Sequence, residues 1–236
     1  MTNESNATRP QRRIYGRRLG PRLRPGRRRL LDELLPSLRF TVPEQGGLDP
    51  ASLFAEPRRA FWLEIGFGGG EHMAAQAAAN RDVGLLGVEP FLSGVAALLA
   101  AVEQDRLENV RLLVDDARLL LASLPDASIE RLFVLFPDPW PKARHKKRRI
   151  VNRDTVAEMA RIVQPGGELR LATDDPDYAR WMLEALLAEP RLEWLAERAA
   201  DWRARTSDWV ETRYERKALD AGRLPVYLRF RRRAEG

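Results

Sequence analysis

The chain of 236 residues contains no cysteine and only two histidines, and these absences exclude several kinds of site. Without cysteine there is no disulfide, no thiolate nucleophile, no iron–sulfur cluster and no zinc site that includes a thiolate. The two histidines, His72 and His145, lie far apart in the sequence, which argues against a histidine-rich metal site. We therefore expect a protein without a bound metal.

Long apolar runs are also missing. No apolar run approaches the ~20 residues that cross a bilayer. The first residues are polar and basic, and they lack the apolar core of a secretory signal peptide. These patterns predict a cytoplasmic protein. No heptad repeat or isolated apolar surface indicates an oligomeric state, and we expect a monomer or a homodimer.

Positive charge is concentrated in three segments. The net charge is +6, but residues 1–30 carry +9, residues 142–149 carry +6 and residues 229–233 carry +4. Together these segments carry a larger net positive charge than the whole chain, so the rest of the chain has a net negative charge. Clustered cations suit a polyanion, because each phosphate contact releases condensed counterions. A genomic bias toward arginine would explain why only four of the forty cations are lysine, but it would not explain the clustering.

The chain divides into a basic arm and one domain. Residues 1–30 are rich in arginine and poor in apolar residues, which predicts a mobile arm, and residues 31–236 form the domain. From about residue 60, strand-like and helix-like segments alternate. We expect strands at 61–65, 83–88, 110–114, 131–136, 169–172 and 226–230, and helices at 71–80, 91–105, 153–163 and 177–188. This alternation predicts an α/β fold, a doubly wound and mostly parallel sheet with helices on both faces.

A glycine-rich turn, EIGFGGG at 64–70, joins the first expected strand to the first expected helix. Glycines such as Gly66 and Gly68 let the backbone turn sharply and approach a ligand closely. A dinucleotide fingerprint would need glycine at position 71, where the chain has Glu71. This glutamate would also repel a pyrophosphate. The turn therefore favours a ligand without phosphate, with Gly66 and Gly68 as cofactor-binding candidates.

Carboxylates stand at the ends of the first three expected strands, at Glu64, Glu89 and the pair Asp115–Asp116. In doubly wound folds ligands bind at this edge, where a carboxylate after the second strand accepts from ribose hydroxyls. The Asp115–Asp116 pair could accept from an adenine amino group. Each acid alone is explained as well by a helix N-cap or a solvated strand end. Together they indicate a cationic, phosphate-free nucleoside, which S-adenosylmethionine fits.

The most specific stretch, FPDPWPK at 136–142, follows the fourth expected strand. Its prolines fix the backbone around Asp138 and remove N–H donors. A rigid carboxylate beside Trp140 suits an unpaired base, which the indole would stack on and the carboxylate would hydrogen-bond. The basic residues 144–149 would then hold phosphates. The simpler alternative is a surface turn with a packed tryptophan, followed by a solvated basic face.

Six motifs extend along the chain: LEIGFGGGEH at 63–72, GVEPF at 87–91, DDA at 115–117, FPDPWPKARHKKRRIV at 136–151, ATDDPDYA at 172–179 and TRYERKALDAG at 212–222. On these motifs the chain resembles bacterial tRNA (guanine-N7-)-methyltransferases over almost its whole length. The resemblance implies a Rossmann-like class I methyltransferase fold. It also implies methyl transfer from S-adenosylmethionine to N7 of a tRNA guanine, guanine 46 of the variable loop.

The same resemblance implies roles for individual residues. Asp138 matches the proposed catalytic position, and the positions that match S-adenosylmethionine binding are Glu64, Glu89, Asp116 and Asp138. Positions that match substrate binding are Lys142, Asp174, Thr212, Arg213, Tyr214 and Glu215. Positions that match RNA contact are Arg144, His145, Lys146, Lys147, Arg148 and Arg149. Arg213 stands where lysine is common and Tyr214 where phenylalanine is common, and both keep the charge or the aromatic ring.

Simpler explanations exist for two of these residues, and two other functions stay open. Asp174 precedes a good helix start and could be an N-cap, and Glu215 could form a surface pair with an arginine.

The chain could methylate an exocyclic amine of RNA, although Asp138 interrupts the Pro-Pro pair usual there. It could also bind RNA without catalysis, which leaves the strand-end carboxylates unexplained. Because guanine N7 has a free lone pair, we expect Asp138 to orient the base rather than to accept a proton.

Overall fold

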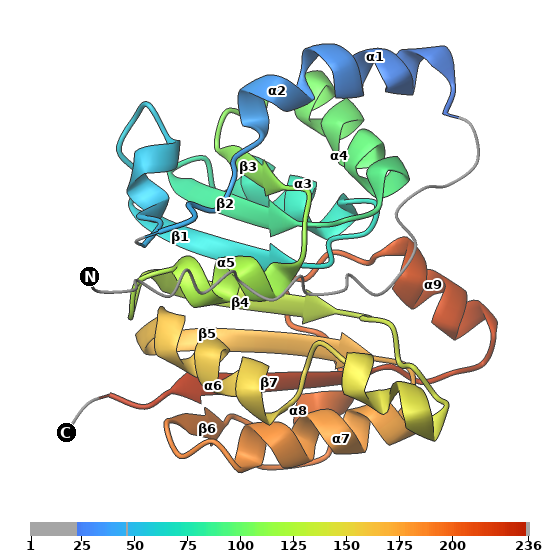
Figure 1. The fold of residues 1–236 in the computed structure, drawn as a ribbon. Coiled ribbons are helices and arrows are strands. Elements are labelled where there is room, and N and C mark those ends of the chain that lie inside the picture. The colour runs from blue at the N-terminus through green and yellow to red at the C-terminus, as the bar shows by residue number, and fades with distance from the viewer. Residues whose placement is uncertain (1–22, 46, 235–236) are drawn as a thin grey trace, which may run out of the picture.

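The computed structural model describes residues 23–45 and 47–234. Its strands are β1 (Ala60–Ile65), β2 (Val83–Val88), β3 (Val110–Leu113), β4 (Ile129–Leu135), β5 (Val163–Thr173), β6 (Leu192–Trp194) and β7 (Val226–Arg232). They form one sheet in the order β3-β2-β1-β4-β5-β7-β6 (Figure 1). Strands β1 to β5 run parallel, and β7 lies antiparallel between β5 and β6. The expected doubly wound, mostly parallel sheet is confirmed.

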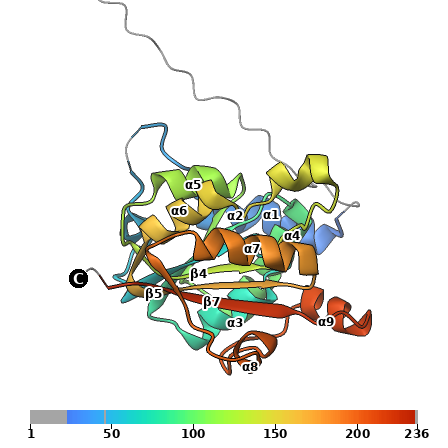
Figure 2. The ribbon, with the colours of Figure 1, turned by 90° about the horizontal axis from the view of Figure 1, so that it is seen from below.

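Helices cover both faces of this sheet. They are α1 (Pro25–Glu33), α2 (Leu35–Leu38), α3 (Glu71–Ala79), α4 (Leu92–Asp105), α5 (Ala117–Ser123), α6 (Arg153–Ile162), α7 (Pro176–Leu187), α8 (Ala200–Arg203) and α9 (Arg213–Asp220), with the 3₁₀ helices η1 (Pro50–Leu53) and η2 (Ala143–Arg148). Helices α5, α6 and α7 lie on one face, and α3 and α8 lie on the other (Figure 2). In the described part of the chain, no helix combines the length and apolar character needed to cross a membrane.

Two hydrophobic cores hold the sheet between its helix layers. Side chains alternate along each strand, so Leu63 and Ile65 of β1 pack in the core under α5, α6 and α7. Trp62 of the same strand packs in the core shared with α3 and α4. Full burial of each such side chain stabilises the fold by roughly 1.5–3 kcal/mol. Packing on both faces makes the sheet rigid, and it fixes the strand ends that carry the site.

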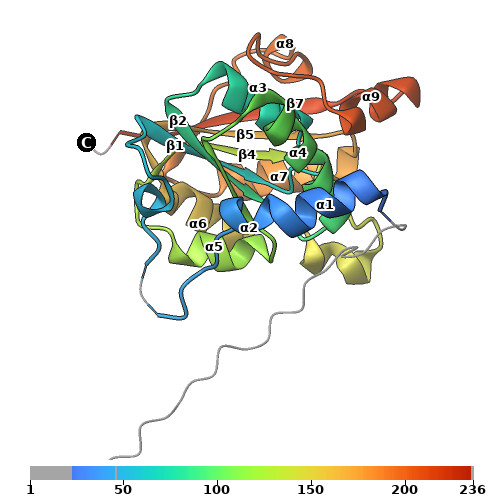
Figure 3. The ribbon, with the colours of Figure 1, turned by 90° about the horizontal axis from the view of Figure 1, so that it is seen from above.

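Helix α1 begins inside the segment expected to be a mobile arm. Leu30 is buried in the α3/α4 core, and Arg29 lies 2.6 Å from Glu103 of α4. Figure 3 shows α1 beside α4. Residues 25–30 are therefore part of the folded domain, because one buried leucine and one ion pair attach them to α4. Residues 1–22 of the expected arm lie outside the described residues.

Candidate active site at the carboxyl edge of the sheet

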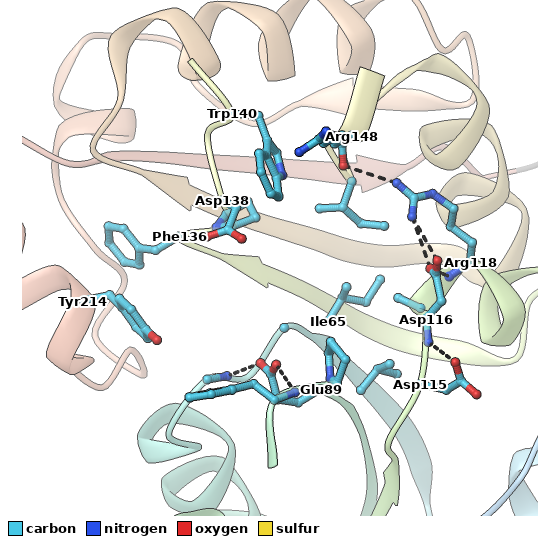
Figure 4. A pocket seen from close by; sticks show the side chains of 18 residues that line it. Ile65, Glu89, Asp115, Asp116, Arg118, Phe136, Asp138, Trp140, Arg148 and Tyr214 are labelled. Atoms are coloured by element: carbon cyan, nitrogen blue, oxygen red, sulfur yellow. Dashed lines mark hydrogen bonds and ion pairs between the residues drawn. The ribbon is translucent and has the colours of Figure 1, made fainter. Parts of the chain in front are cut away.

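A cavity of about 830 Å³ opens at the carboxyl ends of the parallel strands (Figure 4). The chain leaves β1 toward α3 on one face of the sheet, and the connection after β4 leads to α6 on the other. Such a divergence between neighbouring strands creates the crevice where doubly wound folds bind ligands. Its walls are formed by Ile65, Gly66, Gly68, Val88, Glu89, Pro90, Phe91, Asp115, Asp116, Ala117, Arg118, Phe136, Pro137, Asp138, Trp140, Arg148, Ile150 and Tyr214.

The glycine turn after β1 presents bare backbone to this cavity. Gly66 has φ 72°, a left-handed conformation that favours glycine, and a Cβ added there would meet no atom within 4 Å. Gly68 has φ 56°, and its N–H donates to Oε2 of Glu89 at 2.9 Å. A ligand can therefore approach the Gly66 backbone closely, while Gly68 is tied to the loop after β2.

Glu89 follows β2 and is buried against the turn. Its carboxylate accepts from the N–H of Gly68 and the N–H of Phe91, both at 2.9 Å. Burial raises the pKa of Glu89; the two N–H donors oppose this shift, and the charge of Asp138 adds to it. A carboxylate has about four acceptor positions, so two stay available for the hydroxyl groups of a ligand.

At the end of β3, Asp116 has a structural role and also lines the cavity. It is the N-cap of α5, where its Oδ1 accepts from the N–H of Arg118 at 2.9 Å. The Arg118 guanidinium also pairs with Asp116 at 3.1 Å and donates to the carbonyl of Arg148 at 3.3 Å. The N-cap explanation is thus correct for Asp116. Sequence reasoning missed Arg118, although a cation two positions after an acidic N-cap was a usable signal.

The loop after β4 carries Asp138. Phe136 and Trp140 on either side of it have φ 51° and 44°, a conformation that costs a residue with a side chain roughly 1–3 kcal/mol. The N–H of Phe136 donates to the carbonyl of Ala172 at 2.8 Å. The Asp138 carboxylate points into the cavity (Figure 4). Protein around it displaces water and raises the pKa of Asp138.

The basic segment 142–149 lies beside this loop. The Arg148 guanidinium lies 5.0 Å from the ring centre of Trp140, and the ring of His145 meets the same indole edge-on at 6.0 Å. Arg148 lines the cavity, while Lys142, Arg144 and Lys147 are exposed on η2 and its N-cap. Loss of hydration and the charges of its cationic neighbours lower the pKa of His145. Most of the segment is therefore open to an anionic partner.

Arg149, also expected to contact RNA, is the exception, because the structure places its side chain in the interior. Its side chain is 0 % exposed and pairs with Asp177 of α7 at 2.5 Å. Lys146, also expected to contact RNA, pairs with the same carboxylate at 2.9 Å but stays partly exposed. Arg149 points inward because α7 offers it a carboxylate and two aromatic rings, which no local pattern in the sequence shows.

The segment TRYE begins α9 and reaches back to the glycine turn. Thr212 is the N-cap, accepting from the N–H of Glu215 at 3.2 Å. Tyr214 lines the cavity, and a Cβ on Gly68 would lie only 2.7 Å from its Cε2. Arg213 pairs with Glu71, the first residue of α3, at 2.7 Å. The start of α9 therefore closes one side of the cavity.

Glu215, expected to bind substrate or to form a surface pair, lies in the interior, and substrate binding by this residue stays a prediction. It is 1 % exposed and does not line the cavity. Its carboxylate accepts from the Trp209 indole at 2.9 Å, the Tyr227 hydroxyl at 2.5 Å and Arg205 at 3.2 Å. Two buried aromatic side chains and the exposed Arg205 thus anchor α9 to β7 and to the loop before α9. The surface-pair explanation is wrong because α9 presents this side chain to the interior.

Two more carboxylates expected at the site lie away from the cavity wall. Glu64 is buried on the face of the sheet that α3 covers, and Oε2 lies 2.8 Å from Nδ1 of His72. Asp174 pairs with Arg223 at 2.6 Å. The N-cap of α7 is its neighbour Asp175, so the cap explanation for Asp174 is wrong by one residue. Direct ligand contacts by Glu64 and Asp174 stay predictions.

The cavity as a whole carries more negative than positive charge. Glu89, Asp115, Asp116 and Asp138 face it, and two arginines, Arg118 and Arg148, partly offset them. An acidic, partly apolar cavity with open backbone suits a cationic organic ligand. Within residues 23–45 and 47–234, no group of three or more acidic residues or histidines could hold a metal ion.

Comparison with known proteins defines the class. A family model described as a putative methyltransferase matches residues 58–227. The 16S rRNA methyltransferase KamB superposes with a TM-score of 0.51, at 18 % identity over 80 % of this chain and 95 % of its own. The [4+2]-cyclase SpnF superposes with 0.50, at 17 % identity over 79 % of each chain, so this fold alone does not set the reaction. With the family model, these results define a Rossmann-like class I methyltransferase.

Relatives narrow the class to one family. Proteins called tRNA (guanine-N(7)-)-methyltransferase are 52 % identical in Rhodospirillum rubrum, over 94 % of this chain and 88 % of the relative, and 48 % identical in Paramagnetospirillum magneticum, over 97 % and 96 %. Another, from Nitrobacter hamburgensis, is 48 % identical over 94 % and 87 %. The chain belongs to the tRNA (guanine-N(7)-)-methyltransferase family. The resemblance seen in the sequence motifs is confirmed.

Proposed function

We propose that this protein transfers a methyl group from S-adenosylmethionine to N7 of a guanine in tRNA, in the cytoplasm. The observation that carries the proposal is one cavity that joins the acidic ends of β2 and β3 to the Asp138–Trp140 loop and the basic helix η2. Family membership supports both the reaction and the tRNA substrate. The choice of guanine 46 in the variable loop rests on the family resemblance.

The cavity fits the proposed cofactor. S-adenosylmethionine is cationic at its sulfonium and amino groups and has no phosphate, so it matches the acidic wall. Glu89 would hold the ribose with its free acceptor positions, and Asp115 and Asp116 would face the adenine. The open backbone at Gly66 leaves room for close contact. When bound, the cofactor supplies an electrophilic methyl group to the neutral lone pair of N7.

Asp138 has the chemistry to orient and stabilise the target guanine. Within the described part of the chain it accepts no hydrogen bond, so both oxygens are available to the base edge. Guanine becomes cationic as N7 is alkylated, and a fixed carboxylate in a partly desolvated cavity favours that charge. The Trp140 indole beside it offers a stacking surface for a base removed from the tRNA stack. No proton acceptor is needed for this step.

The exposed cations of η2 would bind the tRNA backbone. Arg144 and Lys147 are exposed and lie six and nine residues after Asp138 in sequence, on the helix that follows its loop. Phosphates held there would place a nucleotide near the cavity mouth. Such contacts are electrostatic, so tRNA affinity should fall steeply with salt.

The direct test uses the full chain, S-adenosylmethionine labelled in its methyl group and unmodified tRNA. N7-methylguanosine makes the strand sensitive to aniline cleavage, and we expect one cleavage position, at guanine 46. Label recovered in an exocyclic-amine product would overturn the proposal in favour of the alternative methylation. Binding of tRNA with no calorimetric signal for S-adenosylmethionine would favour a non-catalytic RNA-binding protein.

A further inference from the structure

One cation of the basic segment, Arg149, contacts the catalytic loop from inside the protein. Its Nε donates to the carbonyl oxygen of Pro139 at 2.8 Å, next to Asp138. Its Nη2 pairs with Asp177 at 2.5 Å, and the guanidinium packs 4.6 Å from the ring centre of Tyr178 and 5.1 Å from that of Trp181. One planar group therefore joins the loop after β4 to helix α7.

The loop needs such an external support. Pro137, Pro139 and Pro141 remove three N–H donors, so the loop cannot hold its shape with hydrogen bonds from these positions. Phe136 and Trp140 on either side of Asp138 adopt left-handed backbone conformations that persist only where surrounding structure imposes them. The bond from Phe136 to Ala172 fixes the start of the loop, and Arg149 fixes its centre.

The backbone that carries Arg149 is itself firmly attached to α7. The N–H of Val151 donates to the Tyr178 hydroxyl at 3.2 Å, and the Trp181 indole donates to the carbonyl of Val151 at 2.7 Å. Asn152 donates to the carbonyl of Arg149 at 3.0 Å, and it also begins α6 with a capping box. Helices α6 and α7 thus fix the position of Arg149. Through its hydrogen bond to the Pro139 carbonyl, the guanidinium in turn fixes the loop.

We propose that Arg149 is a positioning residue for methyl transfer, which fixes Asp138 and Trp140 through the Pro139 carbonyl, and that it is not an RNA contact. This inference rests on the proposed function. Lysine could not replace it, because an ammonium group is a compact charge without the planar fork that donates to the Pro139 carbonyl and to Asp177 while packing against Tyr178 and Trp181. A displacement of the loop by about 1 Å is enough to reduce the rate by two orders of magnitude.

The main test is Arg149→Lys, which keeps the charge and removes the planar fork. We expect kcat to fall at least tenfold per folded molecule, counted by calorimetric titration of S-adenosylmethionine sites. The Kd for tRNA and its salt dependence should stay within twofold of the wild-type values. The matched comparison is the double variant Arg144→Ala/Lys147→Ala, two exposed cations of the same segment. It should raise the Kd for tRNA and lose about one unit of salt slope per phosphate contact removed, which Arg149→Lys should not do.

A second readout does not depend on activity. Hydrogen exchange of the peptide spanning 136–142 should be faster in Arg149→Lys than in the wild type, and unchanged in Arg144→Ala/Lys147→Ala. If Arg149→Lys does not fold, Asp177→Asn serves instead, because it removes the ion pair at an exposed carboxylate and should show the same pattern more weakly. Lys146→Ala, which removes the other cation on that carboxylate, should leave the exchange of this peptide unchanged.

Three results would overturn the inference: a loss of tRNA affinity and salt slope with unchanged kcat, full activity per folded molecule, or unchanged exchange in the loop. The first result would show that Arg149 contacts RNA, as the family resemblance implies. If the wild-type protein formed no N7-methylguanosine, the proposed function would fail, whereas the exchange experiment would still report whether Arg149 holds the loop.

Discussion

Gly94 lies in the first turn of α4 and touches the glycine turn. Gly94→Ala therefore tests whether the close approach of α4 to this turn controls cofactor binding. A Cβ at position 94 would lie 2.1 Å from the carbonyl oxygen of Gly68. A close carbon–oxygen contact is about 3.3 Å, so the two backbones would have to separate by roughly 1 Å. Neither partner is a flexible side chain that could turn away. The displaced Gly68 is also the residue whose N–H donates to Glu89.

The expected effect has two parts. Overpacking of this kind costs about 1–3 kcal/mol, which for a protein of this size lowers Tm by roughly 2–4 °C per kcal/mol. Displacing Gly68 disturbs its hydrogen bond to Glu89 and so shifts the Glu89 carboxylate. We therefore expect the Kd for S-adenosylmethionine to rise at least tenfold, about 1.4 kcal/mol. Thermal melting and isothermal calorimetry measure the two effects separately.

Gly26→Ala is the matched control. Gly26 lies in the first turn of α1, where an added Cβ would meet nothing within 4 Å. It should leave cofactor affinity unchanged and either preserve stability or increase it by up to about 1 kcal/mol, because alanine favours helix. If Gly94→Ala melted and bound S-adenosylmethionine like the wild type, the close approach of α4 to the turn would not control the site.

Other predictions concern the carboxylates and the ring around the cavity. Asp138→Asn should reduce turnover at least a hundredfold while tRNA affinity is kept, and near-normal turnover would refute its role. Because the pKa values of Glu89 and Asp138 are raised, both carboxylates become protonated, and lose their attraction for a cation, at a higher pH than the ordinary value of about 4. Calorimetry should therefore show S-adenosylmethionine affinity falling before the pH reaches the ordinary carboxyl value of about 4; a constant affinity down to pH 4 would contradict this. Tyr214→Ala should raise the KM for S-adenosylmethionine several-fold, because the ring lines the cavity and lies against Gly68, and an unchanged KM would show that the ring does not shape the cofactor site. Glu215→Gln should cost roughly 1–3 kcal/mol in denaturant unfolding, since it disturbs a buried hydrogen-bonded network, and an unchanged midpoint would show that Glu215 is not an anchor.

Local patterns in the sequence were sufficient to predict the class of fold and the edge of the sheet at which the cavity lies. The apolar run of β2 matches the expected strand at 83–88, and the glycine turn and Glu89 follow strands as expected. These features are local, because strand periodicity, turn glycines and strand-end acids act over a few residues. The three-residue strand β6 was missed, since it exists only by pairing with β7.

The roles of individual charges were decided by the tertiary structure. Sequence shows that Arg149 belongs to a basic run and that Glu215 follows an aromatic residue, but it does not show which side of the chain faces the interior. Arg149 is buried because α7 brings Asp177 to it from 28 residues away. Glu215 is buried because Tyr227 of β7 and Trp209 meet it there. Whether a charged side chain is buried as an anchor or exposed to a ligand depends on the partner it meets. These partners come together only when the sheet and its helices have assembled.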